Sequence, residues 1–552
     1  MTASVSDRIR EAFQPTPRGV VGLVDDLLRI GRQHALQLLY AGDQCVVLPF
    51  GEASFELPLA RSVFRAALAR IATLCNESAP GSVTPYGGAG RITGDGDAPV
   101  LRVAFSNTPE APRVDIRPGP APLPLSARSG RTTDSPITFF IQKALETPGL
   151  VSLAAGLVDE ASLPTADVAA AVAAILADPA AGRAALQYGS TQGLPALRAK
   201  VLHHVCAADG VAPADIGLSA DDVVLTTGSQ QLLYLLGEAL FDPGDIVLAE
   251  APSYFVYHGV LQSHGVRVVP VPMDDGGMDV AALDAKLAEL KRRGELGRVK
   301  LVYTVDYFQN PTGLTLAADR RPKLVEVVKK YSVGHRILIL EDAAYRELRY
   351  GGPDLPSVKK FDPTNEFVAY ASTFSKPLSP GLKLGYALLP SDLVAPILHL
   401  KGNHDFGSAN LTQHVVDRLM ATGAFDRHVE VLRDVYRAKR DAMLAALDEE
   451  FGDVPGASWT VPGGGLYVWL TLPAGVDAGP NGPLVPAALA AGVLYVPGEF
   501  GHVADEAGEL PRNECRLSFG VADPDRVREG IRRLRAAYRT LERSGVRGMA
   551  AV

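Results

Sequence analysis

The chain has 552 residues, 47% of them hydrophobic, and a formal net charge of −8 at pH 7. A chain of this length exceeds a single hydrophobic core, so two or more domains are expected. The acidic balance argues against nucleic acid or an anionic membrane as the main partner and favours small-molecule chemistry.

The N-terminus and the cysteine spacing both favour the cytoplasm. The first residues read MTASVSDRIREAF and lack an apolar signal core, and no run of about 18 apolar residues is evident. The cysteines, Cys45, Cys75, Cys206 and Cys515, lie far apart without CxxC spacing, so we expect neither a disulfide framework nor a metal site. A soluble protein without a membrane partner is expected.

Residues 1–117 contain arginine but no lysine, unlike the rest of the chain. Hydrophobic patterns predict helices over 18–31 and 62–75 and strands over 35–40, 44–49, 90–93, 100–105 and 113–116. This order predicts a small α+β module. The strand pair, the arginine-bearing helix and the GRI strand resemble the N-terminal module of type II secretion and pilus ATPases. No ATP-binding glycine loop accompanies them, so the resemblance implies no ATPase function.

The Pro-rich stretch 118–134 has the composition of a linker. The module before it contributes no recognised site residue. We therefore expect the module to be dispensable for chemistry and to contact a partner protein or mediate assembly.

From Ile137 onward, strands alternate with helices, as in VVLTTGSQQLLYLLGEAL and ILILEDAAYREL. This alternation predicts a mainly parallel sheet with helices on both faces. A late strand over 515–519 and a helix over 523–541 predict a smaller α+β domain at the C-terminus. No internal repeat is evident.

An anion seat is the first candidate site in this region. The strand that begins at Val223 ends at Thr227-Gly228, and the helix that follows starts with Ser229 and Gln230. Free N–H groups and the positive end of the helix dipole favour an anion there. The alternative is an ordinary strand-to-helix turn with a serine cap.

Three further motifs follow strands. EAPSY supplies Tyr254, whose ring offers a stacking face, and FQNPTG supplies Asn310, an amide donor beside a fixed turn. The apolar strand ILILED delivers Asp342, with Tyr345 three residues later. A carboxylate after so apolar a strand needs a cationic partner. Singly, each motif is also compatible with a core tyrosine or a common turn.

The stretch YASTFSKPLSPGLKLGY places Lys376 after Thr373 and Ser375, two hydroxyl residues that can bind an anion. A lysine in a partly dry pocket has a lowered pKa and can bond covalently to an aldehyde. The alternative is a basic loop residue beside Ser-Pro turns. The glycines Gly381 and Gly385 would let backbone pass close to a ligand.

Taken in order, GSQ, PSY, QNPTG, EDAAY, TFSK and CRLSFG resemble the fold type I pyridoxal phosphate (PLP) enzymes. Among these, the chain is similar to class I/II aminotransferases of the kynurenine/2-aminoadipate and MocR-like branch. The resemblance covers about 135–541. It implies a homodimer with shared active sites, and a large α/β domain over about 165–410. It also implies a small α+β domain from 135–164 and 411–552.

The resemblance assigns a role to each candidate residue. Lys376 holds PLP covalently, Asp342 pairs with the pyridine nitrogen, and Tyr254 stacks on the ring. Asn310 and Tyr345 donate to the phenolic oxygen. The phosphate ligands are Ser229, Gln230, Thr373 and Ser375. On the substrate side lie Arg516, which grips the α-carboxylate, Gly156, Asn310, and Tyr188, which crosses to the partner's site.

Two positions depart from the family pattern. Lys383 stands where an arginine usually contacts the cofactor phosphate, which keeps the charge but loses the forked geometry. Asp306 stands where the family has proline, and the sequence gives this change no meaning.

The predicted function is PLP-dependent transamination between an L-amino acid and a 2-oxo acid, expected to be 2-oxoglutarate. Aromatic, branched and 2-aminoadipate donors all remain open, because Arg516 reads only the carboxylate that they share. A lyase or decarboxylase using the same cofactor is one alternative. A MocR-like regulator that senses PLP is another, but it needs an N-terminal winged helix.

Overall fold

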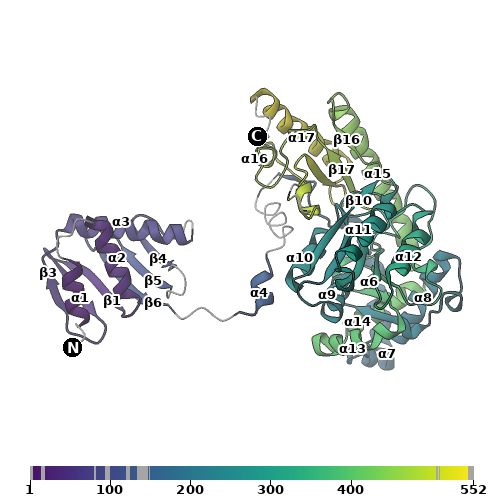
Figure 1. Cartoon of the computed structure of the whole chain (residues 1–552), viewed down its shortest axis with the longest axis horizontal. Helices are drawn as coiled ribbons and strands as arrows, with labels where there is room; N and C mark the ends of the chain where they lie inside the picture. The colour runs from purple at the N-terminus through teal and green to yellow at the C-terminus, as the bar shows by residue number, and fades with distance from the viewer. Residues whose placement is uncertain are drawn as a thin grey trace. The chain divides into compact units, whose positions relative to one another are not determined.

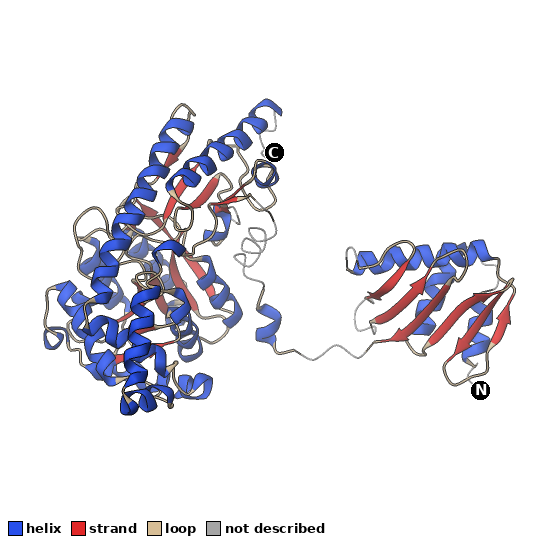
Figure 2. Cartoon of the chain, turned by 180° about the vertical axis from the view of Figure 1, so that it is seen from behind, coloured by secondary structure: helices blue, strands red, loops and turns tan. Residues whose placement is uncertain are grey.

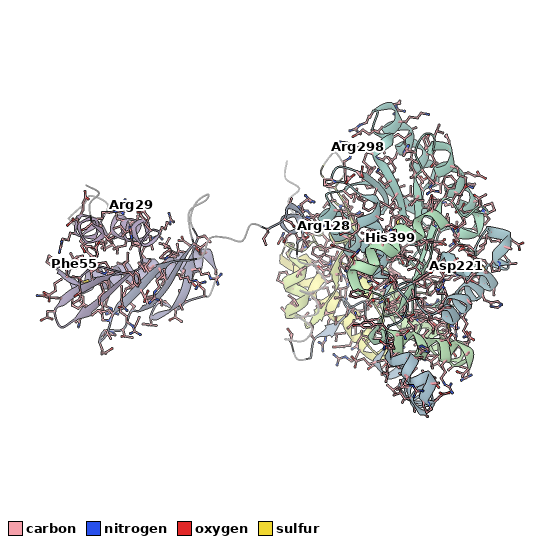
Figure 3. The ribbon with its side chains drawn as sticks, turned by 90° about the horizontal axis from the view of Figure 1, so that it is seen from below. Arg29, Phe55, Arg128, Asp221, Arg298 and His399 are labelled. Atoms are coloured by element: carbon pink, nitrogen blue, oxygen red, sulfur yellow. The ribbon has the colours of Figure 1, made fainter. Side chains whose placement is uncertain are left out.

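A computed structural model of the chain describes residues 4–13, 19–79, 82–93, 100–119, 125–133, 147, 149–504, 508 and 510–544. It contains two compact units, Met1–Ser126 and Ala127–Val552, called here the N-terminal unit and the C-terminal unit (Figure 1). The predicted linker, 118–134, lies partly outside the described residues. The C-terminal unit begins with α4 (Ala127–Arg131). Arg128 of this helix, labelled in Figure 3, pairs with Glu238.

The N-terminal unit is a six-stranded antiparallel sheet in the order β3-β2-β1-β6-β5-β4. Its elements are α1 (Val5–Ala12), α2 (Gly19–Gly31), β1 (Leu36–Ala41), β2 (Gln44–Pro49), β3 (Phe55–Leu57), α3 (Arg61–Ser78), β4 (Gly87–Ile92), β5 (Leu101–Ser106) and β6 (Arg113–Pro118). The predicted helices and strands all occur near their predicted positions, and the structure adds α1 and β3.

Alternating burial along the strands explains why helices pack on one face of this sheet (Figure 2). Leu36, Leu38 and Tyr40 of β1 are buried, whereas the residues between them are more exposed. The buried residues share one core with Leu27 of α2 and Leu68 of α3. An antiparallel sheet can leave its other face open to water, and this one does.

The C-terminal unit is built around an eight-stranded sheet in the order β11-β10-β9-β12-β13-β14-β15-β8. The strands are β8 (Val223–Thr226), β9 (Ile246–Ala251), β10 (Arg267–Asp274), β11 (Gly277–Met278), β12 (Val299–Thr304), β13 (Leu338–Asp342), β14 (Val368–Thr373) and β15 (Gly385–Leu388). Neighbours from β10 to β14 run parallel, and β15 runs antiparallel to both its neighbours. The predicted mainly parallel α/β sheet is confirmed.

Both faces of this sheet are covered, because alternate strand residues enter two separate cores. Val247 of β9 lies in the core that contains α9 (Ser229–Leu240), and Leu248 lies in the core that contains α11 (Val280–Arg292). The other helices around the sheet are α6 (Thr165–Ala177), α7 (Pro179–Leu186), α8 (Pro195–Asp209), α10 (Phe255–His264), α12 (Arg320–Tyr331), α13 (Ser391–Asp405) and α14 (Asn410–Ala421). With both faces covered, the carboxyl ends of the strands are where ligands can reach the sheet.

A four-stranded sheet, β16-β17-β20-β19, forms a second part of this unit. Its elements and their neighbours are β7 (Val151–Ser152), α15 (Ala424–Phe451), β16 (Ser458–Trp459), β17 (Tyr467–Thr471), α16 (Leu484–Ala490), β18 (Val493–Leu494), β19 (Val496–Pro497), β20 (Glu514–Ser518) and α17 (Pro524–Ser544). The early strand β7 pairs with the late strand β18. The domain boundaries drawn from the sequence stay a prediction.

One described stretch, Glu160–Ala177, has a mean hydropathy of 1.4 and passes a test of length and composition for a membrane span. The helix in it is only α6, whose 13 residues rise about 20 Å, short of the roughly 30 Å of a bilayer core. Asp167 lies in its first turn. The helix in this stretch is therefore too short to cross a membrane.

Candidate active site

A cavity of about 410 Å³ lies where strand ends of the large sheet meet the four-stranded sheet. Every predicted site residue except Tyr188 lines it. These lining residues are Gly156, Ser229, Gln230, Tyr254, Asn310, Asp342, Tyr345, Thr373, Ser375, Lys376, Lys383 and Arg516. Residues that are far apart in the sequence are thus brought to one place.

The anion seat is formed by the start of α9. Gly228 is its N-cap, with φ 72°, a conformation that favours glycine, and no side chain caps the helix. The alternative of a serine cap is therefore wrong, since Ser229 is the first helical residue. The N–H groups of Ser229 and Gln230 belong to the first turn, which has no partner within the helix. Such a terminus suits a phosphate.

Glycine is needed at position 385 for a different reason than the close approach to a ligand that the sequence suggested. A Cβ atom there would lie 2.6 Å from the backbone nitrogen of Ser229 and 2.7 Å from the carbonyl carbon of Gly228. The glycine therefore lets β15 pass against the start of α9, rather than against a ligand. Beside it, Thr373 Oγ1 donates to Ser375 Oγ at 2.9 Å. This contact fixes two hydroxyls at the edge of the anion seat.

Asp342 ends β13 and its side chain is buried. Its carboxylate accepts hydrogen bonds from the Tyr303 hydroxyl at 3.0 Å and from the Ala344 N–H at 3.3 Å. No basic side chain among the described residues pairs with it. Burial raises the pKa of Asp342 to about 6, although the Tyr303 hydrogen bond opposes the shift. A cation placed in the cavity would therefore be stabilised here.

Arg516 on β20 is buried and, within the described residues, pairs with no carboxylate. It donates to Asn310 Oδ1 at 2.9 Å and to the Ala154 carbonyl at 2.7 Å. Its guanidinium carbon lies 4.5 Å from the ring centre of Tyr467 and 5.3 Å from that of Phe255. Aromatic faces and neutral oxygens leave its charge available for an anion.

Lys376 follows β14 and is partly buried. Its Nζ donates to the Gly156 carbonyl at 2.8 Å and lies 5.9 Å from the ring centre of Tyr345. Among the described residues it forms no ion pair. The amine is thus held inside the cavity by a neutral oxygen, between the two sheets.

Tyr467 and Phe255 are among the cavity residues that the sequence did not identify as site residues. The Tyr467 hydroxyl lies 3.1 Å from the Tyr345 hydroxyl, and both rings are buried. Nothing in the motif GGGLYVW distinguishes Tyr467 from an ordinary strand residue. Its role follows from the packing of β17 against the large sheet. Phe255 stood beside the recognised Tyr254, so adjacency was the available signal.

The structure shows the surroundings of Asp306 and Lys383, the two residues that depart from the family pattern. Asp306 is fully buried and forms an ion pair with Arg321, which also donates to the Asp306 carbonyl at 3.0 Å. The acidic residue is thus matched by a buried arginine on α12. Lys383 is exposed, lines the cavity and has φ 50°. Lys383 therefore shares the cavity wall with Ser229 and Gln230, which form the predicted phosphate seat.

Tyr188 lies outside the cavity with its side chain 86% exposed. Its ring is 6.5 Å from that of Phe406, another exposed aromatic residue. Leu186 nearby in sequence is also exposed. An apolar group of this kind on the surface is typical of an interaction site.

The residues present fit PLP. The start of α9, which has no side-chain cap, suits a phosphate, and Lys376 provides a primary amine for the aldehyde. The Asp342 carboxylate, which pairs with no cation in the described residues, suits a protonated ring nitrogen. Tyr254 adds an aromatic wall. The donor set therefore matches the chemistry of the cofactor group by group.

Comparison with known proteins gives the same answer. Residues 148–534 match the family model for aminotransferase class I and II. An aromatic-amino-acid aminotransferase from Thermococcus litoralis is 36% identical over 71% of this chain and 88% of its own length. A 2-aminoadipate transaminase from Thermus thermophilus is 36% identical over 72% and 92% of the two chains.

A solved structure is similar as well. Pyrococcus horikoshii kynurenine aminotransferase, solved in complex with PMP, is 34% identical and has a TM-score of 0.68. The similarity covers 75% of this chain and 97% of that one. The chain therefore belongs to the aminotransferase class I and II family, and it is a PLP-dependent transaminase of fold type I.

Proposed function

We propose that this transaminase moves the amino group of an aromatic or large apolar L-amino acid to 2-oxoglutarate, using the residues of the cavity around Lys376. One observation carries the proposal. Asp342, a buried carboxylate, and Arg516, a buried guanidinium, line the same cavity as a primary amine, and in the described part of the chain neither has a partner of opposite charge. Both charges are costly unless ligands complete them.

PLP would be held in the cavity through its phosphate, its ring nitrogen and its aldehyde carbon. Ser229 and Gln230 would bind the phosphate through their N–H groups, and Thr373 and Ser375 through their hydroxyls. Lys383 adds a positive charge. Asp342 would keep a proton on the ring nitrogen, and Lys376 would hold the group covalently. When bound, PLP supplies an electron sink for the bond to the substrate α-carbon.

Lys376 is also the proposed general base. Its Nζ lies inside the cavity, where its hydrogen-bond partner among the described residues is the neutral Gly156 carbonyl. In the reaction it would take the proton from the substrate α-carbon and return a proton to complete the transfer. The apolar lining would exclude water from the reacting atoms. Tyr345 and Asn310 would orient the cofactor by donating hydrogen bonds to its phenolic oxygen.

Arg516 would bind the α-carboxylate common to donor and acceptor by two parallel hydrogen bonds. The walls around the remaining space are apolar or aromatic and include Leu157, Tyr254, Phe255, Val256 and Tyr467. They support a donor with an aromatic or large aliphatic side chain. Relatives named for aromatic amino acids and kynurenine support the same class.

The proposal includes a homodimer in the cytoplasm. The exposed group of Leu186, Tyr188 and Phe406 would be covered by a second copy, with Tyr188 directed at the partner's site. The four cysteines are buried free thiols in this structure, which suits a reducing compartment. The N-terminal unit would contact a partner protein. The described residues of this unit form a sheet-based architecture without a winged helix, which argues against a DNA-binding regulator.

A screen of amino donors against 2-oxoglutarate tests the proposal with the full-length protein. We expect keto acid to form from aromatic and large apolar donors only when 2-oxoglutarate is present. Product that forms without an acceptor would indicate a lyase or decarboxylase instead. A panel of acceptors run with the best donor would show whether another 2-oxo acid is preferred, and that result would overturn the choice of 2-oxoglutarate.

A further inference from the structure

Tyr467 joins the two sheets that form the cavity. It lies at the start of β17 in the four-stranded sheet and is almost fully buried. Its hydroxyl is 3.1 Å from the hydroxyl of Tyr345, which follows β13 of the large sheet. The two rings meet edge to face, with centres 5.7 Å apart and planes at 79°. This geometry is favourable for an aromatic pair.

The same side chain also supports the residue proposed to bind the carboxylate. Arg516 lies over the Tyr467 ring at 4.5 Å and donates to Asn310 Oδ1. Asn310 Nδ2 reaches back to the Tyr345 hydroxyl at 3.5 Å. Tyr467, Tyr345, Asn310 and Arg516 therefore form a closed ring of contacts. Within this ring, Tyr467 touches both the cofactor side and the substrate side.

Gly156 provides an independent observation on the Tyr467 hydroxyl. A Cβ atom at Gly156 would overlap that hydroxyl oxygen, whereas the next nearest atoms, Cζ and Cε1 of Tyr467, would lie at 3.5 and 3.7 Å. Those longer distances are ordinary contacts. Gly156 does not have a positive φ. Glycine is therefore required here by the hydroxyl group and not by the backbone conformation.

We infer that Tyr467 is a positioning residue, whose hydroxyl fixes Tyr345 in the cavity and makes glycine obligatory at position 156. When Tyr467 donates to the Tyr345 oxygen, the Tyr345 hydrogen is free to point into the cavity. The ring of Tyr467 meanwhile supports Arg516. This inference rests on the proposed roles of Tyr345 and Arg516.

Two substitutions separate the hydroxyl from the ring. In the full-length holoenzyme, Tyr467→Phe keeps the ring beneath Arg516, so we expect kcat to fall about tenfold with KM nearly unchanged. Tyr467→Leu removes the ring as well and should raise KM for donor and acceptor. The pH dependence of the cofactor absorption band should shift in Tyr467→Phe. Tyr345, which is proposed to donate a hydrogen bond to the cofactor, is then no longer held by the Tyr467 hydroxyl.

Tyr495→Phe is the matched control. Tyr495 is buried in the same unit, outside the cavity, and its hydroxyl donates to the Ala478 carbonyl at 3.0 Å. Its loss should lower stability without moving kcat, KM or the absorption band. An unchanged kcat and band in Tyr467→Phe would overturn the inference.

A double mutant tests the steric part without any turnover measurement. Gly156→Ala should lower the unfolding midpoint and the cofactor content of the full-length protein. Adding Tyr467→Phe should restore much of both, because the overlapping oxygen is gone. Independent sites would instead give additive losses, and additivity would overturn the inference. Since unfolding needs no substrate, this result stands whether or not the proposed donor and acceptor are correct.

Discussion

The two units of the chain differ in how many polar and charged side chains they bury. In the described part of the N-terminal unit, Asn107 is the one buried polar or charged side chain, and Arg91, Arg102 and Arg113 are exposed. The C-terminal unit buries many, among them Asp209, Asp306, Arg321, Glu341, Arg346, Lys359 and Lys401. Burying charge is costly, so its concentration in one unit marks the unit that carries chemistry.

Within the C-terminal unit a second difference separates structure from site. Asp306 with Arg321, and Asp209 with Arg346, are buried pairs whose charges compensate each other. Asp342 and Arg516 are buried too, but in the described residues neither has a partner of opposite charge. Buried charges that pair with each other need no ligand. Buried charges without such a partner are positions where a ligand of opposite charge would be stabilised.

The largest effect is expected from breaking a buried pair. Asp306→Ala leaves Arg321 buried without its ion-pair partner and should lower the free energy of unfolding of the C-terminal unit by about 3–5 kcal/mol. Asp115 of the N-terminal unit is the control, since it pairs with an exposed Arg117 at 2.7 Å. Asp115→Ala should cost less than about 1 kcal/mol. Denaturant titration of each unit's transition measures both, and equal losses would contradict the comparison.

Asp342→Asn should stabilise the cofactor-free protein while it abolishes transamination. The folded-state pKa of Asp342, about 6, lies above its usual 3.8. The protonated form is therefore favoured by folding, and this stabilisation is present below pH 4 and lost as the pH rises through 6. At pH 7 the asparagine variant should be more stable than the parent by about 3 kcal/mol. Unfolding measured from pH 4 to 7 checks this, and a constant difference would contradict it.

Arg516→Lys should raise KM for every donor and acceptor about tenfold or more, because a forked charged contact is lost. Stability should change less, since the lysine retains a charge in the same place. Arg102→Lys on the open face of the N-terminal sheet is the control and should leave KM unaltered. Steady-state kinetics with several substrate pairs would detect the difference. An Arg516→Lys enzyme with parental KM values would remove Arg516 from the site.

The smallest effect is expected from removing the N-terminal unit. It has its own hydrophobic core, so Ala127–Val552 should fold without it and keep kcat/KM within about twofold of the full chain. The shortened protein should also retain PLP. If it folds and binds PLP yet lacks activity, the N-terminal unit belongs to the catalytic machinery.

The sequence predicted the parts of the site that carry local signals. Ser229 and Lys376 follow an apolar strand and Asp342 ends one, each within a short motif, and strand ends converge in a parallel sheet. Tyr467 could not be predicted, because its role depends on contact between two sheets. The role of Asp306 could not be predicted either, because its ion-pair partner Arg321 lies 15 residues away on a helix.

The short helices and strands were also not predictable from local sequence. Long periodic segments, such as α3 and β5, were predicted close to their observed bounds. α1 has only eight residues, and β3 has three and exists by pairing with β2. Short elements like these depend on tertiary contacts more than on local pattern.

Lys376 is the residue proposed to bind the cofactor covalently, and every other assigned role in the cavity is built around it. Borohydride reduction of the purified full-length protein, followed by peptide mapping, tests this in one measurement. We expect a stable phosphopyridoxyl label on the peptide that contains Lys376, and no label in the Lys376→Ala variant. A label on any other lysine, or a cofactor that binds without being trapped, would contradict the assignment.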